Sequence, residues 1–148
     1  ATPDKTSRLY DSFEISFNKL TDSSADLSIK WEKTRVEFTI QTEVDPIVMA
    51  DIKKQLIDAQ STNPALLYQA ASYYYTSNKD LNRAYTWIKQ STASDPKYWT
   101  LHLQAKIEMS LGKKTEALES ATKSKKLAEE GKNLDYVGLN DRLIKSIK

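Results

Sequence analysis

The spacing of the apolar residues changes once along this sequence, and this change most constrains the fold. Up to Gln41 apolar and polar residues alternate with a period of two, which is typical of strands with one buried face. Beyond Asp45 apolar residues recur every three or four positions, which is typical of amphipathic helices. A chain of 148 residues suits one compact domain, alone or with a small appendage. We therefore predict an α+β fold that is mostly α, with the strands before the helices.

Three alternating runs, at residues 13–17, 25–31 and 36–40, predict the strands. A polar loop at 18–24 and a tighter turn at 32–34 separate them. We expect a three-stranded antiparallel β-meander over residues 9–44, after a flexible N-terminus at residues 1–8. One face of this partial β-domain carries Phe13, Phe17, Trp31 and Phe38, and three strands make a marginal sheet. That face needs a cover from the helices, from further strands or from a second copy of the chain.

Asx-Pro pairs and glycines mark the expected ends of helices in residues 45–148. An Asn or Asp at the N-cap followed by Pro at the first helical position is a strong start signal, because the side chain accepts an orphan N–H. The pairs are Asp45-Pro46, Asn63-Pro64 and Asp95-Pro96, and Gly112 and Gly131 lie where helices should end. The spacing predicts an antiparallel array of about six helices, with a leading helix at 46–60 and a capping helix at 133–147.

The segment between these two helices contains an internal repeat. Asn-Arg-Ala84 and Thr-Glu-Ala117 lie 33 positions apart, and helix–turn–helix units of about 34 residues are the tetratricopeptide signature. Residues 64–97 and 98–130 therefore resemble two tetratricopeptide (TPR) units. In this alignment Ala71, Ala84, Ala105 and Ala117 let helices approach closely. Tyr68 and Tyr75 take the aromatic positions, and Tyr75 is expected in the core.

Nearly the whole chain also resembles the C-terminal half of the Domain of Unknown Function 2911 family. The similar phrases are Ile29-Lys-Trp31-Glu-Lys-Thr-Arg-Val36, Tyr68-Gln-Ala-Ala-Ser-Tyr73-Tyr-Tyr, Tyr85-Thr-Trp87-Ile and Leu111-Gly-Lys. These bacterial proteins usually carry an export signal and place a β-domain before a tail of helical hairpins. The resemblance implies an uncharacterised exported protein of periplasmic or other extracytoplasmic location. It also implies that the first half of the β-domain is missing here. The first residue is Ala1 rather than Met, which fits a processed form or a piece of a longer protein.

Composition excludes several kinds of catalytic and metal site. With no Cys and one His there is no material for a disulfide framework, a zinc ribbon, a Cys nucleophile or a multi-His metal centre. Three Gly exclude a Gly-rich phosphate loop. The single His102 has no acid or nucleophile at a helical spacing that would complete a catalytic dyad. We predict no catalytic residue, no metal, no cofactor and no enzymatic activity.

The residues left for function lie on the first helices of the two units, which line the concave face of such an array. The sequence places an aromatic and polar set there that could bind a peptide at low entropic cost. The predicted ligand-binding residues are Gln69, Tyr73, Trp99, His102, Lys106 and Met109. Lys106 beside His102 and Gln69 could hold a carboxylate. The most economical alternative is that these side chains simply pack against neighbouring elements.

The leading interpretation is a non-enzymatic module that binds a protein or peptide through this concave face. One alternative is a helical scaffold whose enzymatic or carbohydrate-binding site lies in missing N-terminal strands. Another is weak polyanion binding by the basic C-terminal half, through the lysines at 113, 114, 123, 125 and 126. With a net charge of only +2, no nucleic acid is expected as a partner. No apolar run could span a membrane, and the exposed sheet face or edge offers a route to a homo-oligomer.

Overall fold

The chain forms two compact units, residues 1–51 and residues 52–148. The computed structural model describes residues 3–21 and 23–147. The fold is α+β and mostly helical, as predicted, with the strands in the first unit. The boundary between the units falls later than the expected division after residue 44. Within the described residues, no helix combines the length and the apolar character that crossing a membrane requires.

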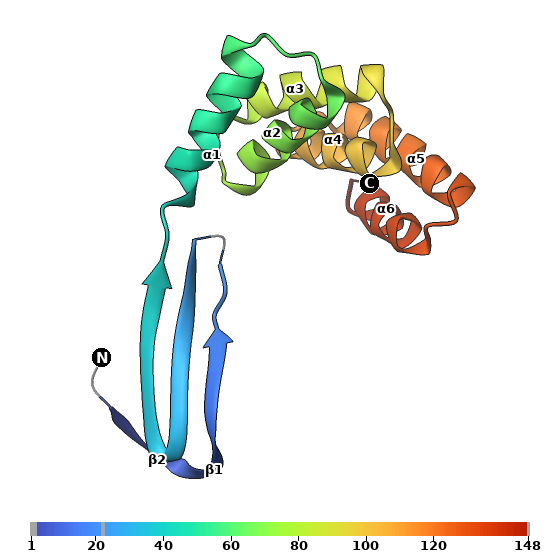
Figure 1. Ribbon diagram of the computed structural model, residues 1–148. Helices are drawn as coiled ribbons and strands as arrows, with labels where there is room; N and C mark the ends of the chain where they lie inside the picture. The colour runs from blue at the N-terminus through green and yellow to red at the C-terminus, as the bar shows by residue number, and fades with distance from the viewer. Residues whose placement is uncertain (1–2, 22, 148) are drawn as a thin grey trace. The chain divides into compact units, whose positions relative to one another are not determined.

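The sheet of the first unit has two antiparallel strands among the described residues, so the predicted number of three is wrong. They are β1 (Asp4–Asn18) and β2 (Ser24–Gln41). The segments predicted as the second and third strands belong to the single strand β2, which turns back on itself (Figure 1). Glu32 takes a left-handed φ of 49° inside it, at the predicted turn. The ends of β2 come together, because the Thr42 N–H donates to the Ser23 carbonyl at 2.9 Å.

The strand β1 begins at Asp4, so residues 4–8 belong to the sheet rather than to a flexible N-terminus. Residues 1 and 2 lie outside the described part of the chain. At its start β1 pairs through Asp4 with Arg35, after the turn of β2, and at its end through Asn18 with Asp26, before the turn. The register shifts along β1 where it passes from one limb of β2 to the other.

The helices are α1 (Val44–Ile52), α2 (Pro64–Thr76), α3 (Leu81–Ser94), α4 (Tyr98–Ser110), α5 (Lys114–Glu130) and α6 (Leu134–Ile147). The predicted leading helix at 46–60 corresponds to α1 together with a π-helical stretch, η1 (Lys53–Asp58), which continues it. In η1 the side chain of Leu56 is buried, and η1 contacts α2. The remaining five helices follow the predicted order and are joined by short loops.

Only one of the three Asx-Pro pairs begins a helix as predicted. Asn63 caps α2 and its side chain accepts from the Ala65 N–H at 2.9 Å. Asp45 lies inside the first turn of α1, and Asp95 follows the end of α3. The helix α4 instead begins after Lys97, whose N–H donates to the Thr100 hydroxyl at 3.0 Å.

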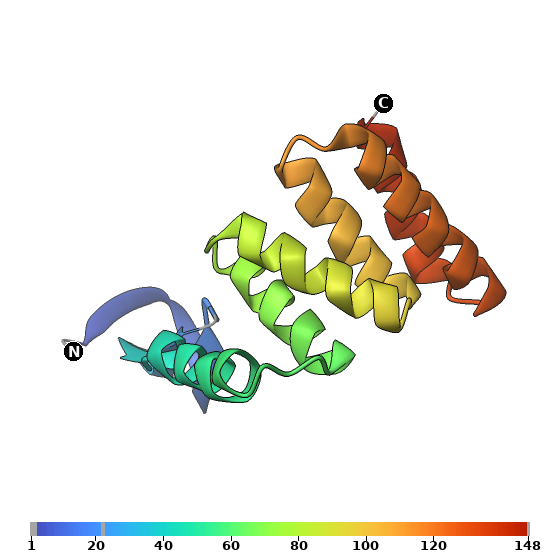
Figure 2. The same ribbon diagram turned by 90° about the horizontal axis from the view of Figure 1, so that it is seen from above.

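The helices of the second unit pack in chain order, and α4 also contacts α2 and α6 (Figure 2). Thus α2, α4 and α6 form one layer, with α3 and α5 packed against it. The alanines predicted at the helix contacts, Ala71, Ala84, Ala105 and Ala117, are all 0% exposed. The aromatic residue in the core of α2 is Tyr74, with its ring 4.8 Å from that of Trp87. Tyr75, which was predicted for that place, is only half-buried.

A polar contact repeats with the helical units. The buried hydroxyl of Ser91 donates to the carbonyl of Pro64 at 2.8 Å, and that of Ser124 donates to the carbonyl of Tyr98 at 2.6 Å. Each bond joins the second helix of a unit to the first residue of its first helix. It therefore fixes how far the two helices of a hairpin can slide along each other.

Candidate functional site

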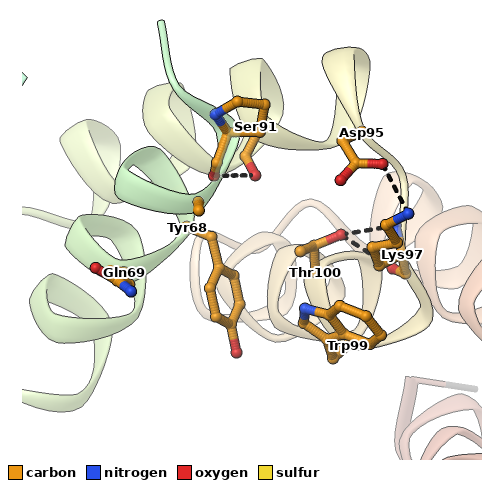
Figure 3. A pocket seen from close by; sticks show the side chains of 9 residues that line it. Tyr68, Gln69, Ser91, Asp95, Lys97, Trp99 and Thr100 are labelled. Atoms are coloured by element: carbon orange, nitrogen blue, oxygen red, sulfur yellow. Dashed lines mark hydrogen bonds and ion pairs between the residues drawn. The ribbon is translucent and has the colours of Figure 1, made fainter. Parts of the chain in front are cut away.

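A cleft of about 160 Å³ opens where α2, α3 and α4 meet. Its walls are mostly apolar and include Tyr68 from α2 and Trp99 from α4, whose rings lie on opposite sides of the opening (Figure 3). Gln69 lies at the α2 side of the cleft and is exposed. At the rim the Asp95 carboxylate is paired with the Lys97 ammonium at 2.9 Å. The cleft can therefore accept an apolar group next to an amide, with its nearest charges already neutralised.

Aromatic rings continue from this cleft across α4 to α6. The ring of Tyr98 lies 4.7 Å from that of Trp99 and 4.8 Å from that of Tyr136. The hydroxyl of Tyr98 accepts from the Asn133 side chain at 3.2 Å. These contacts hold Trp99 in place from one side, so the cleft has a preformed aromatic wall.

His102, one helical turn beyond Trp99 on α4, is held by α6. Its Nδ1 lies 2.8 Å from Oδ1 of Asn140, and its ring is 5.6 Å from that of Tyr136. The Asn140 amide nitrogen donates to the Tyr136 carbonyl and to the Ser124 hydroxyl, both at 2.8 Å. A carbonyl only accepts, so the nitrogen of Asn140 faces Tyr136 and its oxygen faces His102.

It follows that neutral His102 carries its proton on Nδ1 and keeps a lone pair on Nε2. The network has one direction, from His102 through Asn140 and Ser124 to the carbonyl of Tyr98. Burial lowers the pKa of His102 below its ordinary value of 6.5, and the nearby charge of Lys106 lowers it further. The hydrogen bond to Asn140 acts in the opposite direction without reversing the shift. His102 is thus set as a neutral hydrogen-bond acceptor.

Lys106 lies one turn beyond His102 on the same helix. Its ammonium is 5.0 Å from the centroid of the Tyr75 ring on α2, a cation–π contact that bridges the two helices. Among the residues that the structure describes, no carboxylate lies within ion-pair distance of Lys106. The side chain is half-buried, so its charge is less screened than that of a fully exposed lysine.

The other two predicted site residues make different contacts. The ring of Tyr73 makes a cation–π contact with the Lys79 ammonium, which lies 5.6 Å from the ring centroid. The tyrosine in contact with Lys106 is Tyr75 instead. Successive residues of a helix turn by about 100°, so Tyr73 and Tyr75 point in different directions. The sulfur of Met109 accepts a weak contact from the Ser146 hydroxyl at 3.9 Å. Of the predicted site residues, Gln69 and Trp99 therefore line the same cleft, and His102 and Lys106 lie next to each other on α4.

Two of the five lysines in the basic segment are paired with carboxylates. In the basic segment, Lys125 pairs with Asp141 at 2.7 Å, and Lys126 lies 4.0 Å from Glu130. Groups of three His, Asp or Glu side chains that could hold a metal ion do not occur among the described residues.

Several residues of this region were missed by the sequence analysis, above all Asn140. It is 0% exposed although it is an amide. A signal was present, because Tyr136, Asn140, Leu143 and Ile147 follow the i, i+4, i+7, i+11 spacing of a buried helix face. A polar residue on that stripe must find hydrogen-bond partners inside the protein.

In comparisons with known proteins, no family model, no curated protein and no solved structure matches this chain.

Proposed function

We propose that residues 52–148 form a non-enzymatic, TPR-like binding module that holds an extended peptide against α4. The observation that carries this proposal is the aromatic cleft at Trp99, on the same helix face as His102 and Lys106, a lysine with no carboxylate partner among the described residues. Positions 99, 102 and 106 lie at i, i+3 and i+7, which is one face of a helix. An apolar anchor, a hydrogen-bond acceptor and a positive charge therefore lie in line.

The spacing of these groups defines what the peptide should look like. Seven residues of helix separate Trp99 from Lys106, which corresponds to about 10 Å at 1.5 Å per residue. An extended peptide covers that distance in about three residues. We expect an apolar side chain, such as proline or leucine, in the cleft and a carboxylate about three positions away against Lys106.

The absence of enzymatic activity is part of this proposal. His102 has an amide as the partner of its Nδ1, whereas a catalytic His is usually oriented by a carboxylate that stabilises its charged form. The lowered pKa keeps it neutral at neutral pH, which suits a hydrogen-bond acceptor for a peptide N–H.

Selection from a displayed random-peptide library tests the proposal, followed by fluorescence anisotropy with the selected peptides. Trp99→Ala and Lys106→Glu should each weaken binding at least tenfold, which corresponds to about 1.4 kcal/mol. Lys114→Glu, an exposed lysine on α5, serves as the matched control and should bind as the original chain does. Replacing the peptide's acidic residue with lysine should reverse the effect of Lys106→Glu, so that the variant binds this peptide more tightly than the original chain does. Failure to select any peptide, or equal binding by Lys106→Glu, would contradict the proposal.

A further inference from the structure

The sheet of residues 1–51 separates its side chains into one charged and one apolar face. Ile15 pairs with Ile29 and Phe17 with Leu27 on one face, and Glu14 pairs with Lys30 on the other. The second limb of β2 contributes to the apolar face, because Ile40 and Phe17 line the same shallow hollow. Phe13, Trp31 and Phe38 lie two residues from members of this set and so share its face.

Two ion pairs of this unit lie on the other face of the sheet. The Lys30 ammonium is 2.6 Å from the Glu14 carboxylate, and the Lys19 ammonium is 2.8 Å from that of Asp26. The Thr39 hydroxyl also donates to Asp26, across the two limbs of β2. A partner that covers the apolar face therefore leaves these two ion pairs in contact with solvent.

The large side chains of the apolar face are exposed. The exposed fraction runs from 41% for Phe38 to 61% for Phe13, and the others are Ile15, Phe17, Trp31 and Ile40. A Phe or Trp side chain buries roughly 150–250 Å², so four that are about half exposed leave roughly 400 Å² of apolar surface. With the two isoleucines the total approaches about 600 Å² per copy, at the upper end for a monomer's largest patch.

We propose that this apolar face is the interface of a homodimer, in which the sheets of two copies pack face to face. A stable interface of standard size buries roughly 800 Å² per partner, and the exposed apolar side chains supply most of that area. Residues at the rim of the sheet can supply the rest of the buried area. A second copy fits this surface because a patch of apolar side chains is complementary to itself under a twofold axis. Two apolar sheets that pack about 10 Å apart form a sandwich, the usual way to bury such faces.

Sedimentation velocity of the whole chain over micromolar to millimolar concentrations tests this proposal. The chain should approach a mass of twice 16.9 kDa as the concentration rises. Phe17→Asp and Phe38→Asp should each hold it at the monomer mass up to at least tenfold higher concentration. Ser12→Asp, at an exposed position of β1 that alternates with Phe13 and lies outside the hollow at Phe17 and Ile40, is the control and should dimerise as the original chain does.

The original chain alone also decides the question if a variant loses its sheet. Concentration-dependent protection of the β1 and β2 amides from hydrogen exchange should accompany the rise in mass. A chain that stays monomeric at millimolar concentration would overturn the proposal, as would larger aggregates without a limiting dimer mass. Equal dimerisation by Phe17→Asp, Phe38→Asp and the control would also overturn it. None of these outcomes depends on peptide binding by the helical unit.

Discussion

Nδ1 of His102 on α4 lies 2.8 Å from Oδ1 of the fully buried Asn140 on α6. This hydrogen bond connects the proposed binding face to the interior. The Asn140 amide nitrogen donates in turn to the Ser124 hydroxyl, which donates to the carbonyl of Tyr98, the first residue of α4. The last helix thereby fixes the orientation of the one imidazole in the chain. Because every polar atom of Asn140 has a partner, the network can be tested one member at a time.

Replacing Asn140 with Ala should destabilise the protein by about 2–4 kcal/mol. The change removes hydrogen bonds worth about 1 kcal/mol each and leaves a small cavity. The free energy of unfolding from urea titrations measures the effect. Asn82→Ala, an exposed asparagine on α3, is the control and should stay within about 0.5 kcal/mol of the original chain. A loss of less than about 1 kcal/mol for Asn140→Ala would show that the network is not formed in solution.

His102 should titrate below its ordinary pKa of 6.5 and carry its neutral-state proton on Nδ1. It is the only His in the sequence, so its nitrogen and carbon resonances in an NMR titration need no assignment. Lys106→Met should raise the pKa of His102, because it removes the positive charge that lowers it. Lys123→Met, at an exposed position on α5, should leave it unchanged. A proton found on Nε2 would contradict the assigned direction of the network.

The same pKa shift predicts how stability depends on pH. Between the lowered pKa of folded His102 and 6.5, the unfolded chain binds more protons than the folded chain. The contribution of His102 to the free energy of unfolding is therefore fully present above pH 6.5. This contribution is lost as the pH falls through 6.5 toward the pKa of folded His102, and below that pKa it no longer changes with pH. Comparing the original chain with His102→Gln over this range isolates the contribution, and a constant difference between the two would contradict it.

Ser124→Ala should destabilise the protein more than Ser91→Ala, although both side chains are 0% exposed. Ser91 makes one hydrogen bond, to the carbonyl of Pro64, whereas Ser124 also accepts from Asn140. We expect about 1 kcal/mol for Ser91→Ala and about 2 kcal/mol for Ser124→Ala. In double-mutant cycles Asn140→Ala should couple to Ser124→Ala and add independently to Ser91→Ala. Equal losses for the two serine variants would contradict the second bond of Ser124.

The parts of the fold that followed from the sequence rest on local rules. Ala71, Ala84, Ala105 and Ala117 were placed at helix contacts because only a small residue at such a spacing lets helices approach. Asn63 was identified as a cap because its side chain satisfies an N–H two residues away. Both arguments need only the neighbouring sequence or the repeat.

The parts that could not be predicted depend on small rotations or on the ends of elements. A shift of one position turns a helical side chain by about 100°. Moving the repeat alignment by one residue therefore changes which of Tyr73, Tyr74 and Tyr75 is assigned to the core. The helix α5 has 17 residues where α3 has 14, so the spacing of the repeat alone does not say which residue of α6 faces His102. At Glu32 a left-handed residue let one strand continue where a break was expected.

The last prediction concerns the close approach of the helices, on which the binding face depends. Ala105 at the centre of α4 is 0% exposed, so a larger side chain there must push α4 away from its neighbours. Ala105→Leu should cost about 1–3 kcal/mol through overpacking, although leucine is more apolar and a good helix former. Ala93→Leu, at an exposed position on α3, should stay within about 0.5 kcal/mol of the original chain. Urea unfolding measures both variants. If Ala105→Leu were as stable as Ala93→Leu, the helices could not be as tightly nested as these contacts require, and the cleft beside Trp99 would lose its rigid wall.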